Sequence, residues 1–356
     1  MSGISSLSSS DYGSLASLVA DASATSKKLD LLTAQASSGD VATSYAGLGA
    51  GASVSLNLNP ALGHLQTWQN NIAAATGNMQ VTQTAMTQIQ QIASDLLSQL
   101  NGLQGADGSE IDTIAASARD DLSQVANLLD STNGTTYVFA GTDSANPPVP
   151  DPDSITSSGF FTQIAAAVAN LGTAGASATS AAVLAIGSSN AAGTTPFSAT
   201  IGSIPLIQTG DGQMQPIGLL ANANATVTST GTSTTGSYMR DLMCALATVG
   251  SLSSSQQNDP GLTDFVQDTR TGLTGAISAM AEDTGVLGNQ QTTLTTESTT
   301  LQQTSTALTT QLSSVQDADM AQTLSNITLV QNQLQASYQL ISNMSALSLA
   351  KYLPAG

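Results

Sequence analysis

Few side chains in this sequence could carry acid–base, nucleophilic or metal chemistry. The 356 residues include one histidine, His64, and one cysteine, Cys244. A general base needs an oriented partner and a nucleophile; nothing around His64 predicts either, so we interpret it as a residue near a helix start. Cys244 lies among apolar neighbours, which favours a buried thiol over a reactive one. A zinc site built from cysteine and histidine needs several such ligands, and an internal disulfide needs a second cysteine in the same chain, so the sequence excludes both.

Two pairs of aspartates are the remaining candidates for metal ligands. Asp317 and Asp319 are separated by one residue, as are Asp151 and Asp153. The further acidic ligands and the glycine of a calcium-binding loop do not follow. We therefore interpret the first pair as the acidic start of a helix and the second as turn residues. No phosphate-binding loop, dinucleotide motif or nucleophile elbow occurs, and we predict no catalytic residue, no metal and no cofactor.

The charge of the chain restricts its partners. Acidic residues outnumber basic ones 24 to 6, which gives a formal net charge of −18. Nucleic acids and anionic membrane surfaces are bound through basic clusters, so we expect neither as a partner. The first residues lack the basic and apolar segments of a cleaved signal peptide, and no window of about 18 apolar residues predicts a membrane span.

A long seven-residue repeat is the strongest structural signal. Such a repeat is typical of a helix that packs against another helix along one seam. Its apolar members are Met280, Leu287, Leu294, Leu301, Leu308 and Val315. At ~1.5 Å per residue the seam would extend roughly 50 Å. An ordinary antiparallel helical bundle would give a similar pattern and stays an alternative.

Four stretches have the apolar spacing of amphipathic helices. They cover residues 14–37, 65–103, 109–129 and 262–351, with Ser109 as the expected N-cap of the third and a break expected at 317–319. We predict assembly interfaces on the first and last stretches. Their residues are Leu15, Leu18, Leu29 and Leu32 on the first, and Leu324, Ile327, Leu334, Tyr338 and Ile341 on the last. Leu329 and Leu340 give the last stretch a second apolar face, so we expect it to have neighbours on two sides.

The middle of the chain lacks helical periodicity. Residues 134–236 are rich in glycine, proline, serine and threonine, with a predicted β-hairpin around Asp211–Gly212 and a predicted short helix over 160–171. We predict a mainly α fold in which long N- and C-terminal helices pair as a coiled-coil or helical-bundle rod, with a small β-containing inserted domain. The expected domains are a terminal coiled-coil assembly domain (1–57 and 310–356), a helical bundle (58–140 and 237–309) and the insert (141–236).

The outer faces of the predicted helices carry little charge. Glutamate and lysine, the usual residues of exposed helix faces, occur only at Glu110, Glu282, Glu297, Lys27, Lys28 and Lys351. Small neutral polar residues are less costly to bury than charges. We therefore expect these faces to pack against other copies of the chain, with a compositional bias of the genome as the alternative.

Three segments resemble the flagellin superfamily. The Leu-rich run that ends in Gln-Ala-Ser-Ser-Gly39 is similar to its N-terminal region, and residues 317–353 are similar to its C-terminal helix. The segments 137–143 (Tyr-Val-Phe-Ala-Gly-Thr-Asp) and 146–149 (Asn-Pro-Pro-Val) resemble the hook–filament junction branch of the superfamily more than its flagellins. One departure is clear, because residues 40–49 lack the basic residue and the Asp-Asp-Pro-Ala-Gly motif that commonly follow, and contacts of that motif cannot be carried over.

The resemblance implies properties that the spacing of residues does not. The terminal segments would be largely disordered in the monomer and would become helical on assembly. The chain would be exported unfolded, without a cleaved signal peptide, and a dedicated export chaperone would bind its C-terminal helix. Its place would be extracellular, in the bacterial flagellum. Its partners would be further copies of itself, the neighbouring hook-associated protein and flagellin subunits.

We therefore expect a structural assembly protein, most specifically a subunit that joins hook to filament. A flagellin that forms the filament itself is the alternative in the same class. An exported surface adhesin or binding module is the alternative from another class, although only 3% of the residues are aromatic and could stack on sugars. An enzyme is the least supported alternative.

Overall fold

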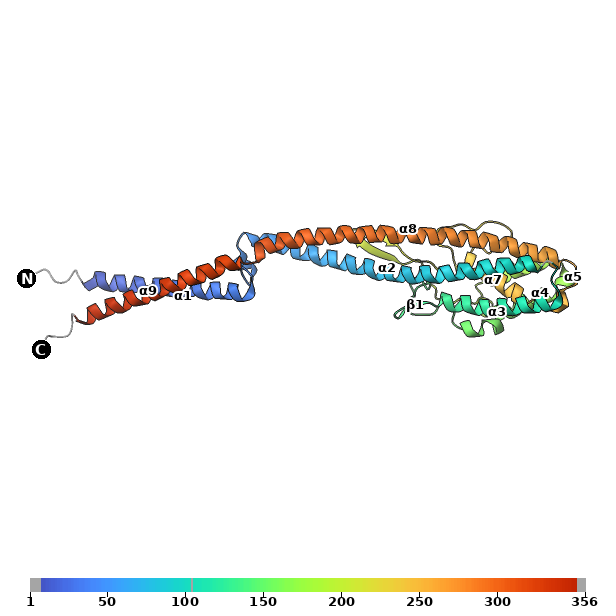
Figure 1. Ribbon diagram of the computed structural model, residues 1–356, viewed down its shortest axis with the longest axis horizontal. Helices are drawn as coiled ribbons and strands as arrows, with labels where there is room; N and C mark the ends of the chain where they lie inside the picture. Colours follow the sequence, from blue (N-terminus) through green and yellow to red (C-terminus); the bar gives the residue numbers. More distant parts are fainter. Residues whose placement is uncertain (1–7, 104, 351–356) are drawn as a thin grey trace, which may run out of the picture. The chain divides into compact units, whose positions relative to one another are not determined.

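Long helices dominate the computed structural model, which describes residues 8–103 and 105–350, with side chains for 15–103 and 105–344. The long helices are α1 (Ser8–Ser38), α2 (Gly51–Gly102), α3 (Gly108–Leu129), α8 (Leu262–Gln316) and α9 (Met320–Ala350) (Figure 1). The shorter ones are α4 (Gly159–Ala169), α5 (Leu171–Ala174), α6 (Ala176–Ser188) and α7 (Tyr238–Gly250), with 3-10 turns η1 (Tyr45–Leu48), η2 (Pro152–Ser157) and η3 (Ser254–Gln256).

The described residues contain two small antiparallel sheets of two strands each. β1 (Thr132–Asn133) pairs with β2 (Thr136–Tyr137), and β3 (Leu206–Gly210) pairs with β4 (Gln213–Pro216). The turn between β3 and β4 contains Asp211 and Gly212, and Gly212 has a φ of 68°, a left-handed conformation that glycine adopts without steric cost. The predicted hairpin at this place is therefore confirmed.

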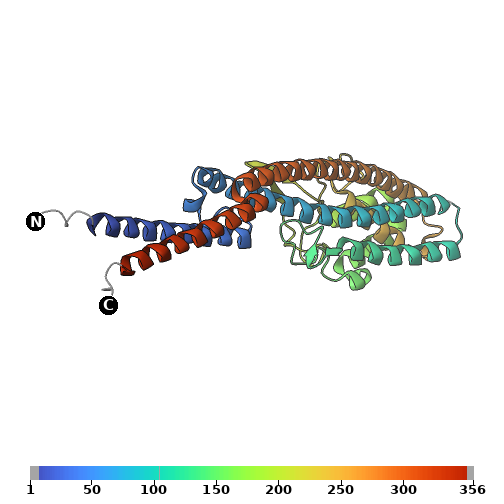
Figure 2. The same cartoon turned by 60° about the vertical axis from the view of Figure 1, so that its left-hand side comes forward.

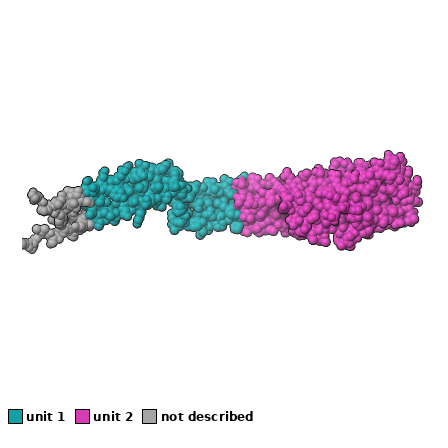
Figure 3. Space-filling view, turned by 90° about the horizontal axis from the view of Figure 1, so that it is seen from below, with its two compact units in different colours: residues 1–65, 303–356 teal, residues 66–302 magenta. Residues whose placement is uncertain are grey.

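The chain divides into two compact units (Figure 3). Unit 1 comprises residues 1–65 and 303–356, and unit 2 comprises residues 66–302. These boundaries differ from those of the three predicted domains, and that finer division stays a prediction.

In unit 1, α1 and α9 lie side by side and run antiparallel, as two views show (Figures 1 and 2). On both helices the buried and half-buried positions recur at alternating steps of three and four residues. This spacing keeps one stripe of each helix facing its neighbour, as in a coiled coil. The predicted pairing of the long terminal helices is confirmed.

Unit 2 is built around α7, all 13 residues of which are buried. Helices α3, α4 and α6 contact α7. Further core side chains come from α2 and α8, among them Met79, Met86, Leu96 and Phe265. With few aromatic side chains available, aliphatic side chains and methionine fill most of this core.

Several helix starts differ from the sequence expectation, with α1 starting at Ser8 rather than at residue 14. Helix α2 starts at Gly51 rather than near residue 65. Proline normally interrupts a helix, but α2 continues through Pro60. Helix α3 is capped by Asp107 rather than by Ser109. The Asp107 carboxylate accepts hydrogen bonds from the amides of Ser109 and Glu110, and the Glu110 carboxylate accepts one from the Asp107 amide. The Ser109 hydroxyl also donates to the Asp107 carboxylate, and together with the two amides it holds the pKa of Asp107 below its usual value.

Candidate assembly interface

The α1 side of the terminal helix pair uses the predicted leucines to face α9. Leu32 is buried, and Leu15, Leu18 and Leu29 are half-buried, with the small Ala22 buried between them. Leucine and alanine are strong helix formers, and their spacing keeps them on one stripe. The sequence prediction placed these four leucines at an interface between copies, a role that stays a prediction.

The α9 side divides the predicted residues into two groups. Ile327, Leu334 and Ile341 are half-buried in the stripe that faces α1. That stripe is centred on Val330, which is 2% exposed. Leu324 and Tyr338 lie outside it, with 54% and 55% of their surfaces exposed. Three of the five predicted residues therefore lie in the contact between α1 and α9, and two lie on the surface of the helix pair.

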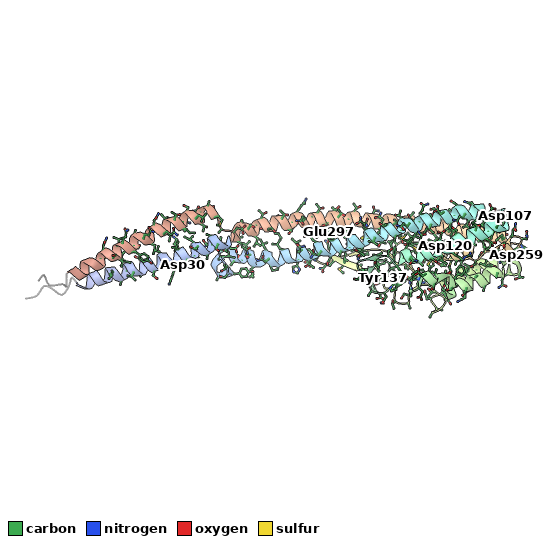
Figure 4. All side chains as sticks on the ribbon, turned by 60° about the horizontal axis from the view of Figure 1, so that its bottom comes forward. Asp30, Asp107, Asp120, Tyr137, Asp259 and Glu297 are labelled. Atoms are coloured by element: carbon green, nitrogen blue, oxygen red, sulfur yellow. The ribbon has the colours of Figure 1, made fainter. Side chains whose placement is uncertain are left out.

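Exposed apolar side chains form two flanks on α9, one on each side of the stripe that faces α1. At about 100° per residue, Met320, Leu324 and Tyr338 share one flank, and Leu329 and Leu340 share the other. The flanks carry no counterbalancing charge, because residues 320–344 contain no Asp, Glu, Lys, Arg or His. Helix α1 does carry charges, such as the exposed Asp30 (Figure 4). Because exposed apolar patches are typical of interaction sites, the two flanks are candidates for contact with other copies.

A joint of backbone hydrogen bonds connects the inner ends of α1 and α9. The Ala318 amide donates to the Gly39 carbonyl oxygen at 2.7 Å, and the Val41 amide donates to the Gln316 carbonyl oxygen at 2.7 Å. Asp40 and Asp317 thus form an antiparallel β-bridge. Gly39 has a φ of 80°, which only glycine adopts readily. The Gln316 side-chain amide also donates to the buried Ser55 hydroxyl at 2.5 Å.

The two aspartates that sequence reasoning weighed as metal ligands lie at this joint. Asp319 accepts a hydrogen bond from the Gln322 amide at 3.0 Å, and so caps the start of α9. Asp317 belongs to the β-bridge. The predicted break at 317–319 is observed, since α8 ends at Gln316 and α9 starts at Met320.

The seven-residue repeat lies along α8. Met280, Leu287, Leu294 and Leu301 are buried within unit 2, whereas Leu308 and Val315 are half-buried within unit 1. Gly51 at the start of α2 permits the last contact, because a Cβ atom there would lie 2.8 Å from Val315 Cγ1. The role of these six residues as one coiled-coil seam stays a prediction.

The other chemical candidates occupy structural positions. His64 is exposed on α2. Cys244 is buried in α7, and burial raises the pKa of its thiol above the usual range, which disfavours the nucleophilic thiolate. Asp151 is the N-cap of η2, and Asp153 accepts a hydrogen bond from Asn127 Nδ2 at 3.3 Å. No cluster of three or more metal-binding His, Cys, Asp or Glu side chains exists among the described residues.

Sequence reasoning missed two exposed apolar residues on α1, Val19 and Leu31. Both lie off the three-four spacing that defined the stripe, so the periodicity assigned them no role. A scan for apolar residues left over after the stripe is assigned would have found them.

Two regions of the chain match known protein families. Residues 11–143 match the bacterial flagellin N-terminal helical region, and residues 271–353 match the bacterial flagellin C-terminal helical region. Together the matches cover more than half of the chain. The chain belongs to the flagellin superfamily. Comparison with curated proteins gives no match.

Membership of the flagellin superfamily defines the general role. The protein is a structural component of the bacterial flagellum, in a family that is exported out of the cell, is non-enzymatic and self-assembles with other flagellar subunits. The matched regions include nearly all of α1 and all of α9, the helix that carries the exposed flanks. None of the helices described here is long and apolar enough to span a membrane.

Proposed function

We propose that this flagellin-superfamily protein is the subunit that joins hook to filament, and that it forms a ring of copies through its terminal helices. The observation that carries the self-assembly is the pair of apolar flanks on the uncharged α9. An apolar surface of several large side chains gains free energy when a neighbouring helix covers it, at about 25 cal/mol per Å². With one flank on each side of the helix pair, each copy presents surfaces for two neighbours, as a ring requires.

The junction role, as opposed to the filament role, is supported by the segment 137–149, whose sequence resembles the junction branch. In unit 2 this segment is part of the core, since Phe139 and Val149 are buried. The Ala221 amide donates to the Phe139 carbonyl oxygen at 3.0 Å, and the Val149 amide donates to Asp130 Oδ1 at 2.9 Å. The segment thus shapes unit 2 and is one place where a junction subunit can differ from a filament subunit.

The proposed partners follow from the same surfaces. Copies of this chain cover one another's flanks, and the hook-associated protein and the flagellin contact the two ends of the ring. Before assembly, an export chaperone covers the exposed leucines of α9 and keeps the exported monomer from associating.

Deletion of the gene tests the junction role. The expected result is hooks without filaments in electron micrographs, with intact filament protein released into the medium. Loss of the filament together with loss of any secreted filament protein would instead identify this chain as the flagellin. Normal filaments with a loss of surface attachment would favour an adhesin.

A further inference from the structure

A cavity inside unit 2 lies between α6, α7 and α8, far along the chain from the terminal helices. Its volume is about 360 Å³, near the lower end of small-molecule sites. Its walls include apolar side chains of all three helices, among them Val183, Leu184, Ala245, Phe265 and Leu273. Self-association through α9 does not use this cavity.

The cavity contains two carboxylates and no positive charge from any described residue. Asp241 and Asp268 line it, whereas no lysine, arginine or histidine does. Asp268 accepts a hydrogen bond from the Ser180 hydroxyl at Oδ2, at 2.9 Å, and its Oδ1 accepts none from the described residues. The buried Asp241 accepts from the Thr234 hydroxyl and from the Thr235 amide, which fixes its orientation.

A hydroxyl in the same wall is also available to a ligand. Thr248 is 3% exposed and lines the cavity. Threonine in a helix commonly donates to the carbonyl oxygen four residues earlier, yet the Thr248 hydroxyl makes no hydrogen bond within the described part of the chain. A ligand with a polar group in this cavity would give the hydroxyl a hydrogen-bond partner.

We propose that this cavity binds a small organic cation with an apolar body, of the alkylammonium type. The ammonium group would lie against the free oxygen of Asp268 and near Thr248, and the hydrocarbon would contact Leu184, Phe265 and Leu273. The formal charge of the whole chain, −18, raises the local concentration of cations around the protein. The pairing of carboxylates with an apolar wall selects for cations that also carry hydrocarbon.

The test uses isothermal titration calorimetry of the full-length protein with isoamylammonium chloride and with isoamyl alcohol, which has the same carbon skeleton without the charge. We expect the ammonium compound to bind with one site per chain and the alcohol to bind at least tenfold more weakly. Equal binding of the two, or no binding of the ammonium compound up to tens of millimolar, would overturn the proposal.

Two matched variants localise the site. Asp268→Asn should weaken isoamylammonium binding at least tenfold while it preserves an acceptor for Ser180. Asp264→Asn removes the same charge from an exposed position one turn earlier on α8 and should leave binding unchanged. Equal losses in both variants would show diffuse electrostatic attraction and would contradict the assignment of the cavity. Ala245→Leu, which fills the cavity, should abolish binding, and circular dichroism checks that this variant folds.

Discussion

The backbone of Ala318 is hydrogen-bonded to that of Gly39, although the two residues come from opposite halves of the chain. This bond and its neighbour between Val41 and Gln316 connect the end of α1 to the start of α9. Two helices that are distant in sequence are thereby held in register at one end, which lowers the entropy that their pairing must overcome.

The conformation of Gly39 is the first feature to test. Its φ of 80° strains any residue with a Cβ atom. Gly39→Ala should therefore destabilise unit 1 by about 1 kcal/mol, measured by urea unfolding followed by circular dichroism. Gly63→Ala is the matched control, because Gly63 lies inside α2 with open space around it. The control should raise the free energy of unfolding by roughly 0.5–1 kcal/mol. Equal effects of the two variants would refute the requirement for a left-handed glycine at position 39.

The flanks of α9 should control assembly without controlling the fold. Leu324→Asp places a charge on an exposed apolar flank, so the monomer should keep its helix content. Burial of that charge between copies is costly, and the critical concentration for assembly should rise more than tenfold, as measured by sedimentation. Asn332→Asp adds the same charge on the exposed side of α9, away from both flanks. Assembly of Leu324→Asp at the wild-type concentration would contradict the proposed interface.

For Leu334→Asp, inside the helix pair, we expect a loss of helix pairing in addition to a loss of assembly. Leu334 is half-buried against α1, so the variant should lose part of the α1–α9 pairing as well as assembly. We expect a soluble chain with reduced helix content, measured by circular dichroism. A fully helical, assembling and motile Leu334→Asp strain would show that the pairing stripe is dispensable.

Asp130 gives unit 2 a defined dependence on pH. Burial raises the pKa of this half-buried carboxyl to about 6, despite the hydrogen bond from the Val149 amide. The folded state then binds more protons than the unfolded state between about pH 4 and 6, so stability falls as the pH rises through that window. Asp130→Asn keeps an acceptor for Val149 and removes the charge. At pH 7 this variant should raise the free energy of unfolding by about 1 kcal/mol, a value that is discounted because Asp130 is partly exposed.

The gain from Asp130→Asn should vanish near pH 4, where the carboxyl of the wild type is protonated. Thermal unfolding between pH 4 and 8 measures both limits. Asp120→Asn, at an exposed position on α3, controls for the loss of one negative charge. A gain from Asp130→Asn that is constant with pH would exclude the titration of this group as its cause.

Gly187 and Cys244 form a tight contact between α6 and α7. A Cβ atom on Gly187 would collide with Cys244 Sγ and would lie 3.1 Å from Thr235 Cγ2. Gly187→Ala should thus cost about 1–3 kcal/mol by overpacking. The double variant Gly187→Ala with Cys244→Ala should recover most of that loss, because the Cβ of residue 244 lies 3.8 Å away. A double-mutant cycle measured by urea unfolding tests this. If the losses of stability of the two single variants simply add in the double variant, the collision is ruled out.

Much of the helical framework could be predicted because its signals are local. The three-four spacing of Leu15, Leu18, Leu29 and Leu32 predicts α1, and Asp317 and Asp319 mark the break between α8 and α9. Periodicity indicates which face of a helix is apolar but not which neighbour covers it. That is why Ile327 and Tyr338, predicted together, lie in different environments.

The features that could not be predicted depend on contacts between residues that are distant in sequence. Asp283 looks like an ordinary surface residue of a helix, yet it is 1% exposed. Its carboxylate accepts hydrogen bonds from the amides of Ala225, Thr226 and Val227. No local pattern in α8 predicts that a loop some 60 residues earlier supplies these donors. The cavity beside Asp268 is hidden for the same reason, since three helices that are separate in sequence line it.

The break between α8 and α9 interrupts the ladder of helical hydrogen bonds within unit 1. Because the helical hydrogen bonds of α8 end at Gln316 and those of α9 start anew after Asp319, α9 can lose its structure without unwinding α8. Its main stabilising partner inside the chain is α1, so amide hydrogen exchange in α1 and α9 should proceed together and faster than in α8. A chain with this break can present its terminal segments in an unfolded form while unit 2 stays native.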